Sequence, residues 1–173
     1  MKFVNLLGYN ILSNLDSINL EKGIINTINP HSYCIAKKDK FFNKSLINAD
    51  ILIPDGIGIV FAAKLINNTR INKISGSDIH KYLLEYANVR ALKVFYMGSN
   101  KATLDLIKKK INKSYPKIYV HSYSPPFKEE FSRIENKTII NKIKLANPDI
   151  LFVGMTAPKQ EKWVEKNKLD IDV

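Results

Sequence analysis

Cysteine is almost absent from this sequence, because Cys34 is the only one in 173 residues. One cysteine cannot form an intramolecular disulfide or a cysteine-rich metal site, so we expect a chain that works in a reducing compartment. Its thiol is expected to behave as a small buried hydrophobe. Histidine is also scarce, with three in the chain. No spacing of His and Cys indicates a zinc site, a Ser-His-Asp triad or a Cys-His pair.

Long apolar runs are lacking as well. No stretch of about 18 apolar residues could span a bilayer, and polar residues interrupt the first 20 positions, so we expect no signal peptide. Acidic residues number 16 against 27 Lys and Arg, which gives a net charge of +11. This balance favours nucleic acid, nucleotide diphosphates or an acidic membrane surface as partners, although a solvated basic face accounts for it equally well.

The chain has enough apolar residues, 45% of the total, to build the core of one globular domain. Apolar strand-like runs occur at 3–11, 23–28, 51–53, 92–97, 118–122 and 149–153. Helices are predicted around 18–22, 31–42, 61–65, 78–86, 104–111, 131–145 and 163–169. This alternation predicts an α/β fold, with a Rossmann-like, mostly parallel sheet flanked by helices and joined by right-handed crossovers.

The stretch ADILIPDGIGIV, residues 49–60, organises this prediction. An apolar strand should end at Pro54, which cannot donate to a ladder, and Gly56 allows a tight turn. Asp55 is then at the carboxyl end of a central strand, where open α/β sheets gather ligands beside helix amino termini. The alternative, that Asp55 only caps the following helix, is equally consistent with an isolated Asp-Gly.

Polar residues also end three other predicted strands. They are Thr27 and Asn29, then Gly98, Ser99 and Asn100, and finally residues 154–160. In one parallel sheet these ends would share an edge with Asp55, which could take a proton from a hydroxyl as a general base. The Gly-Ser-Asn turn would cradle a phosphate or only cap a helix. Phe127, in a proline-rich loop, would stack on a base or pack locally.

Five segments resemble the WecG/TagA/CpsF family of bacterial glycosyltransferases in order and spacing. They are INTINP (25–30), ADILIPDGIGIV (49–60), KISGSD (73–78), VFYMGS (94–99) and PDILFVGMTAPKQEKW (148–163). Members move an N-acetylmannosamine-type sugar from a UDP donor to lipid-linked N-acetylglucosamine diphosphate, with inversion and without a metal. Their products feed teichoic acid, enterobacterial common antigen or capsule. The resemblance implies a UDP-sugar-dependent hexosyltransferase on the cytoplasmic face of the plasma membrane.

The resemblance also assigns roles to individual residues. Asp55 would deprotonate the acceptor hydroxyl, while Thr27 and Asn29 would hold a sugar. Lys73, where the family often has arginine, would stabilise the leaving phosphate without the bidentate fork, and Gln160 would bind the donor. Asp55, Thr27 and Lys73 are thus the catalytic candidates. The remaining predicted substrate-binding residues are Gly56, Ser77, Asp78, Gly98, Ser99, Phe127, Gly154 and Pro158.

Similar proteins continue beyond the helix of Trp163 into a strand, a glycine-rich turn and a helical appendage thought to meet the membrane. This sequence ends at Val173. We therefore expect a single glycosyltransferase domain over residues 1–173, truncated at its C-terminal end, that binds a UDP-sugar weakly and turns over poorly. The partners implied are a UDP-sugar, a polyprenyl-diphosphate-linked acceptor, an anionic membrane surface and a second copy of the chain.

Two alternatives to an active transferase remain. One is a UDP-sugar-binding remnant of the same fold that has lost catalysis. The other is a basic nucleic-acid-binding domain, which the scattering of the lysines over several predicted helices disfavours. The resemblance does not distinguish among UDP-N-acetylmannosamine, its uronic acid and other UDP-hexoses, since these share phosphate and acetamido contacts.

Overall fold

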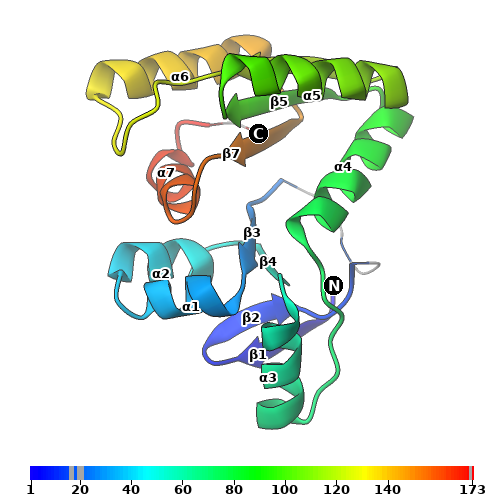
Figure 1. Cartoon of the computed structure of the whole chain (residues 1–173), viewed down its shortest axis with the longest axis vertical. Coiled ribbons are helices and arrows are strands. Elements are labelled where there is room, and N and C mark those ends of the chain that lie inside the picture. The colour runs from blue at the N-terminus through cyan, green and yellow to red at the C-terminus, as the bar shows by residue number, and fades with distance from the viewer. Residues whose placement is uncertain (16–17, 19–21, 172) are drawn as a thin grey trace. The chain divides into compact units, whose positions relative to one another are not determined.

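The structure, a computed structural model, describes all residues except 16–17, 19–21 and 172 (Figure 1). The chain divides into two compact units, Met1–Lys81 and Tyr82–Val173. The first holds a four-stranded sheet and the second a three-stranded sheet. The helix expected around 18–22 lies mostly outside the described residues, so that prediction is not tested.

The first unit is built on strands in the order β1-β2-β4-β3. Their bounds are β1 (Phe3–Leu6), β2 (Tyr9–Leu12), β3 (Ile25–Ile28) and β4 (Ile51–Pro54). β1 and β2 pair antiparallel, whereas β4 pairs in parallel with both β2 and β3. The single run expected over 3–11 is therefore a hairpin. Leu7 and Gly8 have φ values of 53° and 89°, as a tight turn between two such strands requires.

Helices pack on this first sheet through a shared apolar core. They are α1 (Pro30–Ala36), α2 (Lys40–Ile47) and α3 (Ile57–Asn67). Phe42 of α2, Ile59 of α3 and Leu52 of β4 all belong to that core. The continuous helix expected over 31–42 is wrong, because Asp39 accepts hydrogen bonds from the N–H groups of the next helix and starts it anew.

The cysteine departs from the expectation of burial. Cys34 is a free thiol and is exposed on α1. The core-facing positions of this helix include Ser32 and Ala36, which are buried. Cys34 lies between them on the helix and so faces away from the core, since residues two apart do not share a helix face.

The second unit has an all-parallel sheet in the order β6-β5-β7. Its strands are β5 (Lys93–Gly98), β6 (Tyr119–Tyr123) and β7 (Ile150–Gly154). Its helices are most of α4 (Gly76–Arg90), then α5 (Lys101–Ser114), α6 (Arg133–Ala146) and α7 (Lys159–Asn167).

Helices cover both faces of this second sheet. Val94 and Tyr96 on β5 join one core with residues of α4 and α5. Phe95 and Met97, which alternate with them, join another core with residues of α6 and α7. Four consecutive buried residues on one strand are typical of a parallel strand with helices on both sides.

The predicted α/β class, with mainly parallel strands and flanking helices, is confirmed. The expectation that all the polar strand ends share the edge of one sheet is wrong. β3 and β4 belong to one sheet and β5 and β7 to the other, and no ladder joins the two sheets within the described residues. The alternation of strands and helices is the same for one sheet or two, because it does not specify which strands pair.

Candidate active site

Asp55 directly follows β4, and its backbone is fixed by the neighbouring strand. Its N–H donates to the carbonyl of Ile28 at 2.8 Å, where Ile28 and Pro54 are ladder partners. Its half-buried side chain forms no hydrogen bond or ion pair with the described part of the chain. Gly56, with φ 107°, is the N-cap of α3, and α3 has no side-chain cap. The capping interpretation of Asp55 is therefore wrong, and its carboxylate is available to a ligand.

The amino termini of α1 and α3 lie against one another beside Asp55. A Cβ on Gly56 would lie 4.0 Å from Cβ of Asn29, and one on Gly58 would lie 2.6 Å from Cγ of Pro30. Only glycine at position 58 allows this approach without displacing the proline. Asn29 is therefore held next to the Asp55 turn by the packing of two helix starts.

Asn29 also has a structural task at this point. Its Oδ1 accepts from the N–H of Ser32 at 2.8 Å, and Oγ of Ser32 accepts from the N–H of Asn29 at 2.8 Å. These reciprocal bonds form a capping box that starts α1. The predicted contact of Asn29 with a sugar is not tested by this geometry, but the cap fixes where its side chain lies.

Thr27 lies two residues before Asn29 on β3 and pairs with Ile53 in the ladder. Its neighbour Ile28 belongs to the core shared with α1, α2 and α3. Since side chains alternate along a strand, Thr27 faces the opposite side of the sheet. Thr27, Asn29 and Asp55 thus come from adjacent strand ends of one sheet, as predicted.

Lys73 reaches the same strand end through its neighbour. The N–H of Ile74 donates to the carbonyl of Pro54 at 3.0 Å, which attaches the segment before α4 to the end of β4. Lys73 itself is exposed. The structure therefore brings Lys73 to the Asp55 region along the backbone, with its ammonium group in solvent.

Asp78 and Ser77 are occupied in starting α4. The Asp78 carboxylate accepts from the N–H and the Oγ of Ser75 at 2.8 and 2.6 Å, and Oγ of Ser77 lies 2.8 Å from Oγ of Ser75. These hydrogen bonds, aided by the charges of Lys73 and Lys81, lower the pKa of Asp78. Asp78 is thus an ionised capping residue, and its predicted role in substrate binding stays a prediction.

In the second unit, Gly98 and Gly154 end neighbouring strands and are ladder partners. Gly98 has φ 117°, and a Cβ on it would lie 2.2 Å from the carbonyl oxygen of Gly154. Ser99 also has a positive φ, 63°, and its carbonyl accepts from Oγ of Ser124 at 2.8 Å. The predicted binding positions Gly98, Ser99 and Gly154 are therefore brought together, and the glycines allow the backbone to pass close.

Two further positions, Asn100 and Phe127, bear on alternatives that the sequence left open. Asn100 caps α5 by accepting from the N–H of Thr103 at 2.8 Å, so this part of the Gly-Ser-Asn turn acts as a helix cap. Phe127 is fully exposed, at 105%. It does not pack within its loop, and its predicted contact with a base remains a prediction.

Gln160 is held at both ends of its carboxamide. Its Oε1 accepts from the N–H of Met155 at 3.2 Å, and its Nε2 donates to Oε1 of Glu161 at 2.9 Å. Pro158 is the N-cap residue of α7, directly before this helix. Gln160 thereby links the loop after β7 to the first turn of α7.

Glu161 was not among the predicted residues, although it ends the Pro-Lys-Gln-Glu motif. It is 4% exposed, and its Oε2 is buried without a hydrogen-bond partner among the described residues. Burial raises the pKa of the Glu161 carboxyl, and the hydrogen bond from Gln160 opposes that shift. The sequence gives no signal for this burial, because glutamate in the first turn of a helix is ordinarily a solvated residue.

A ring of hydrogen bonds fixes α7 against α6. Nε1 of Trp163 donates to Oδ1 of Asn136, Nδ2 of Asn136 donates to Oδ1 of Asn167, and Nδ2 of Asn167 donates to the carbonyl of Trp163, each at 2.7 Å. Trp163 and Asn167 are buried. Because these groups satisfy one another, the helix that carries Gln160 has a defined position in the second unit.

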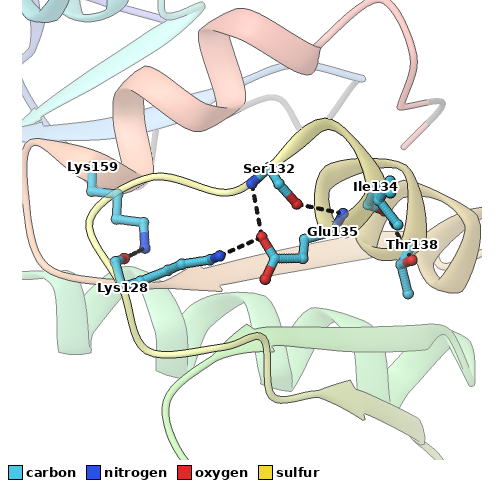
Figure 2. A network of polar contacts seen from close by, with 6 residues as sticks. All are labelled: Lys128, Ser132, Ile134, Glu135, Thr138 and Lys159. Carbon is cyan, nitrogen blue, oxygen red and sulfur yellow. Dashed lines mark hydrogen bonds and ion pairs between the residues drawn. The ribbon is translucent and has the colours of Figure 1, made fainter.

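The loop between β6 and α6 is attached to both helices of this face (Figure 2). Nζ of Lys128 pairs with Oε2 of Glu135 at 2.7 Å, and the same oxygen accepts from the N–H of Ser132 at 2.7 Å. Lys159, beside Gln160, donates to the carbonyl of Lys128 and lies 4.1 Å from the ring centroid of Phe131. The loop therefore borders the Pro-Lys-Gln-Glu segment.

The profile of the glycosyl transferase WecG/TagA/CpsF family matches residues 7–173. The chain belongs to this family. The resemblance found in the sequence is thus confirmed. The family match covers every predicted site residue, from Thr27 to Gln160.

Curated relatives share one name, N-acetylglucosaminyldiphosphoundecaprenol N-acetyl-beta-D-mannosaminyltransferase. The Bacillus subtilis (strain 168) protein is 34% identical over 142 residues, 82% of this chain and 53% of that protein. A Bacillus spizizenii relative is 27% identical over 169 residues, covering 96% and 64%. A Staphylococcus aureus relative is 28% identical over 139 residues, covering 80% and 52%. The chain spans less than two thirds of the length of each.

The predicted site residues thus form two groups, one in each unit. The first surrounds the end of β4 and contains Thr27, Asn29, Asp55, Gly56 and Lys73. The second surrounds the ends of β5 and β7 and contains Gly98, Ser99, Gly154, Pro158 and Gln160. Across the part of the chain that is described, no three His, Cys, Asp or Glu side chains are grouped to hold a metal ion.

Proposed function

We propose that this chain carries the catalytic core of an inverting glycosyltransferase. It would move an N-acetylmannosamine-type sugar from a UDP donor to undecaprenyl-diphosphate-linked N-acetylglucosamine, in the synthesis of a cell-surface polysaccharide. The name shared by the relatives supports the sugar and the acceptor. Membership of a glycosyl transferase family supports the reaction class.

The observation that carries this proposal is the state of Asp55. Its carboxylate is half-buried and unpaired within the described residues, at the carboxyl end of a parallel strand. Asp55 also directly precedes Gly56, the N-cap of an 11-residue helix that has no side-chain cap. A free carboxylate suits a general base, and the unfilled N–H groups of a helix start suit an anionic ligand.

In the proposed reaction, Asp55 takes the proton from the acceptor hydroxyl. That oxygen attacks the anomeric carbon from the face opposite the nucleotide, and the bond between this carbon and the UDP oxygen breaks. UDP leaves with the electron pair, so the configuration inverts and charge develops on the diphosphate. Lys73 would offset that charge, while Thr27, Asn29 and Gln160 would orient the sugars.

The test measures UDP release from UDP-N-acetylmannosamine with a soluble-tailed N-acetylglucosamine diphospholipid acceptor. Asp55→Asn keeps the size of the side chain but removes the base, so we expect acceptor-dependent release to fall at least about a hundredfold. UDP affinity should not change. Asp105→Asn, an exposed surface residue paired with Lys101 on α5, is the matched control and should retain full release.

The outcomes separate the proposal from its alternatives. UDP binding without release from the unaltered chain would favour the UDP-sugar-binding remnant, or another UDP-hexose as donor. A chain that does not bind UDP would overturn the glycosyltransferase proposal.

We also propose that the chain works at the cytoplasmic face of an anionic membrane. Its net charge of +11 and the lipid-linked acceptor in the relatives' name support this location. Within the described residues, no helix has the length and apolarity needed to cross a bilayer. Self-association with a second copy is a further proposal, which rests only on the resemblance to similar proteins. Analytical sedimentation of the purified chain tests it.

A further inference from the structure

The hydrogen bonds of Gln160 leave only one orientation for its carboxamide. The Met155 N–H can only donate, so it requires the oxygen of Gln160 on its side. The Oε1 of Glu161 accepts from Gln160, as a carboxyl oxygen without a proton does in either charge state, so it requires the nitrogen of Gln160 on the other side. If Glu161 were apolar, one of these two constraints would be absent, and the Gln160 carboxamide could rotate more freely to exchange its oxygen and nitrogen positions.

The burial of Glu161 is not explained by a contribution to stability alone. Its side chain is buried, it accepts one hydrogen bond from Gln160, and its Oε2 has no partner in the described part of the chain. A buried carboxylate with an unsatisfied oxygen lowers the stability of a fold relative to an apolar residue of similar size. The side-chain partner that Glu161 has among the described residues is Gln160, so the geometry supports a contribution through that amide.

A nearby residue provides the contrast. Glu165 lies one turn further along α7 and is also buried, at 9% exposure, but its carboxylate pairs with Lys168 at 2.9 Å. Glu165 is thus a buried carboxylate on the same helix with a conventional ion pair.

We propose that Glu161 is a positioning residue for Gln160. It fixes the carboxamide so that the second hydrogen on Nε2 and the second lone pair on Oε1 remain free for a polar ligand. Under the proposed function, on which the identity of this ligand rests, that ligand is the UDP-sugar donor. Glu161 itself would not touch the donor, because its carboxylate is buried.

The orientation of Gln160 can be observed without a ligand, because it is the only glutamine in the chain. Glutamine labelled with ¹⁵N at the side chain gives one amide signal from the full chain. In Glu161→Ala we expect this signal to shift and its hydrogens to exchange with water about tenfold faster, since the hydrogen bond from Nε2 to Glu161 is lost. In Glu165→Ala the signal should stay in place.

Glu161→Met is the second variant and keeps the proposal testable if Glu161→Ala does not fold, since methionine fills a similar volume without a charge. We expect it to unfold at the same temperature as the unaltered chain or higher, while the Gln160 signal changes as in Glu161→Ala. A purely structural Glu161 would instead show a lower unfolding temperature. An unchanged Gln160 signal in both Glu161 variants would overturn the proposal.

Binding of UDP then links this role to the donor. Gln160→Ala and Glu161→Ala should each weaken UDP binding about tenfold, and the double variant should be no weaker than either, because both remove one contact. Glu161→Gln, which retains an acceptor oxygen, should restore most of the affinity. Additive losses would overturn the positioning role. If the unaltered chain did not bind UDP, the proposed function would fail, while the amide signal would still decide the role of Glu161.

Discussion

Gly98 is the glycine at which an added side chain would meet its closest contact. Its φ is 117°, a region that L side chains rarely adopt, and an added Cβ would lie 2.2 Å from the carbonyl oxygen of Gly154. Gly98→Ala should therefore lower the free energy of unfolding by about 2–4 kcal/mol, through strain at this φ together with the clash. Urea unfolding followed by circular dichroism measures the loss.

Gly76 provides the control for this prediction. It lies in the first turn of α4, and an added Cβ would meet no atom within 4 Å. Gly76→Ala should leave the urea midpoint unchanged or raise it slightly, because alanine favours a helix over glycine. Equal losses in Gly76→Ala and Gly98→Ala would show that the contact with Gly154 is not the cause.

The lowered pKa of Glu135 predicts how the free energy of unfolding depends on pH. The ion pair with Lys128 and the hydrogen bonds from Ser132 lower its pKa from 4.5 to about 2. A carboxyl whose pKa is lowered by folding adds stability above its unfolded pKa, and this is lost as pH falls from about 4.5 towards 2. Glu135→Gln should flatten that part of the curve.

The effect of Glu135 should be modest, since the carboxylate is partly exposed and water and salt screen the pair. Urea midpoints at several pH values between 7 and 2.5, in low salt, measure it. Glu129→Gln is a matched control from the same loop. An unaltered slope below pH 4.5 in Glu135→Gln would contradict the role of this network in stability.

Among the elements, α3 presents an apolar stripe that its packing does not use. Ile57, Phe61 and Leu65, four residues apart, are 72%, 62% and 69% exposed. They lie on one face of the helix that follows Asp55. Exposed apolar side chains of this kind, in a strongly basic chain, favour contact with a lipid surface.

Replacing two of these side chains tests the α3 stripe. Phe61→Glu with Leu65→Glu should reduce sedimentation with anionic vesicles about tenfold or more, since two apolar contacts are lost and two repulsive charges are added. Ile47→Glu, a single exposed isoleucine on α2, is the control and should sediment like the unaltered chain. Retained binding in the double variant would remove α3 from the membrane contact.

The local elements could be predicted where the sequence carries its own punctuation. Pro54 ends β4 and Gly56 starts α3, so the position of Asp55 at a strand end followed from the chemistry of two residues. The break between α1 and α2 was missed, since Asp39 among lysines also fits the polar side of one helix. A capping side chain can be recognised in a sequence only when its neighbours do not fit a continuous helix.

The candidate site was predicted in part for the same reason. Thr27, Asn29 and Asp55 end adjacent strands of one sheet, as expected from their place after apolar runs. Glu161 was missed because its burial results from packing around α7 and not from the local sequence. The distribution of the strands over two sheets was also missed, since pairing between strands depends on contacts far apart in the chain.

At the scale of the whole molecule, the net charge of +11 and the α3 stripe would make separable contributions to the proposed membrane binding. Raising the salt from 0.1 M to 1 M shortens the Debye length from about 10 Å to about 3 Å, so binding through charge should be lost. Binding through apolar contact should persist, because salt does not weaken it. Sedimentation with vesicles that contain anionic lipid, at both salt concentrations, separates the two.

We expect the unaltered chain to lose most of its vesicle binding at 1 M salt and to keep a remainder that Phe61→Glu with Leu65→Glu abolishes. Vesicles of zwitterionic lipid alone should retain only that remainder. Duplex DNA under the same conditions provides the comparison, since non-specific binding to DNA also falls steeply with salt. Binding to DNA at 0.1 M salt without binding to anionic vesicles would favour the basic nucleic-acid-binding alternative, because a charge that serves a membrane must act on lipid head groups.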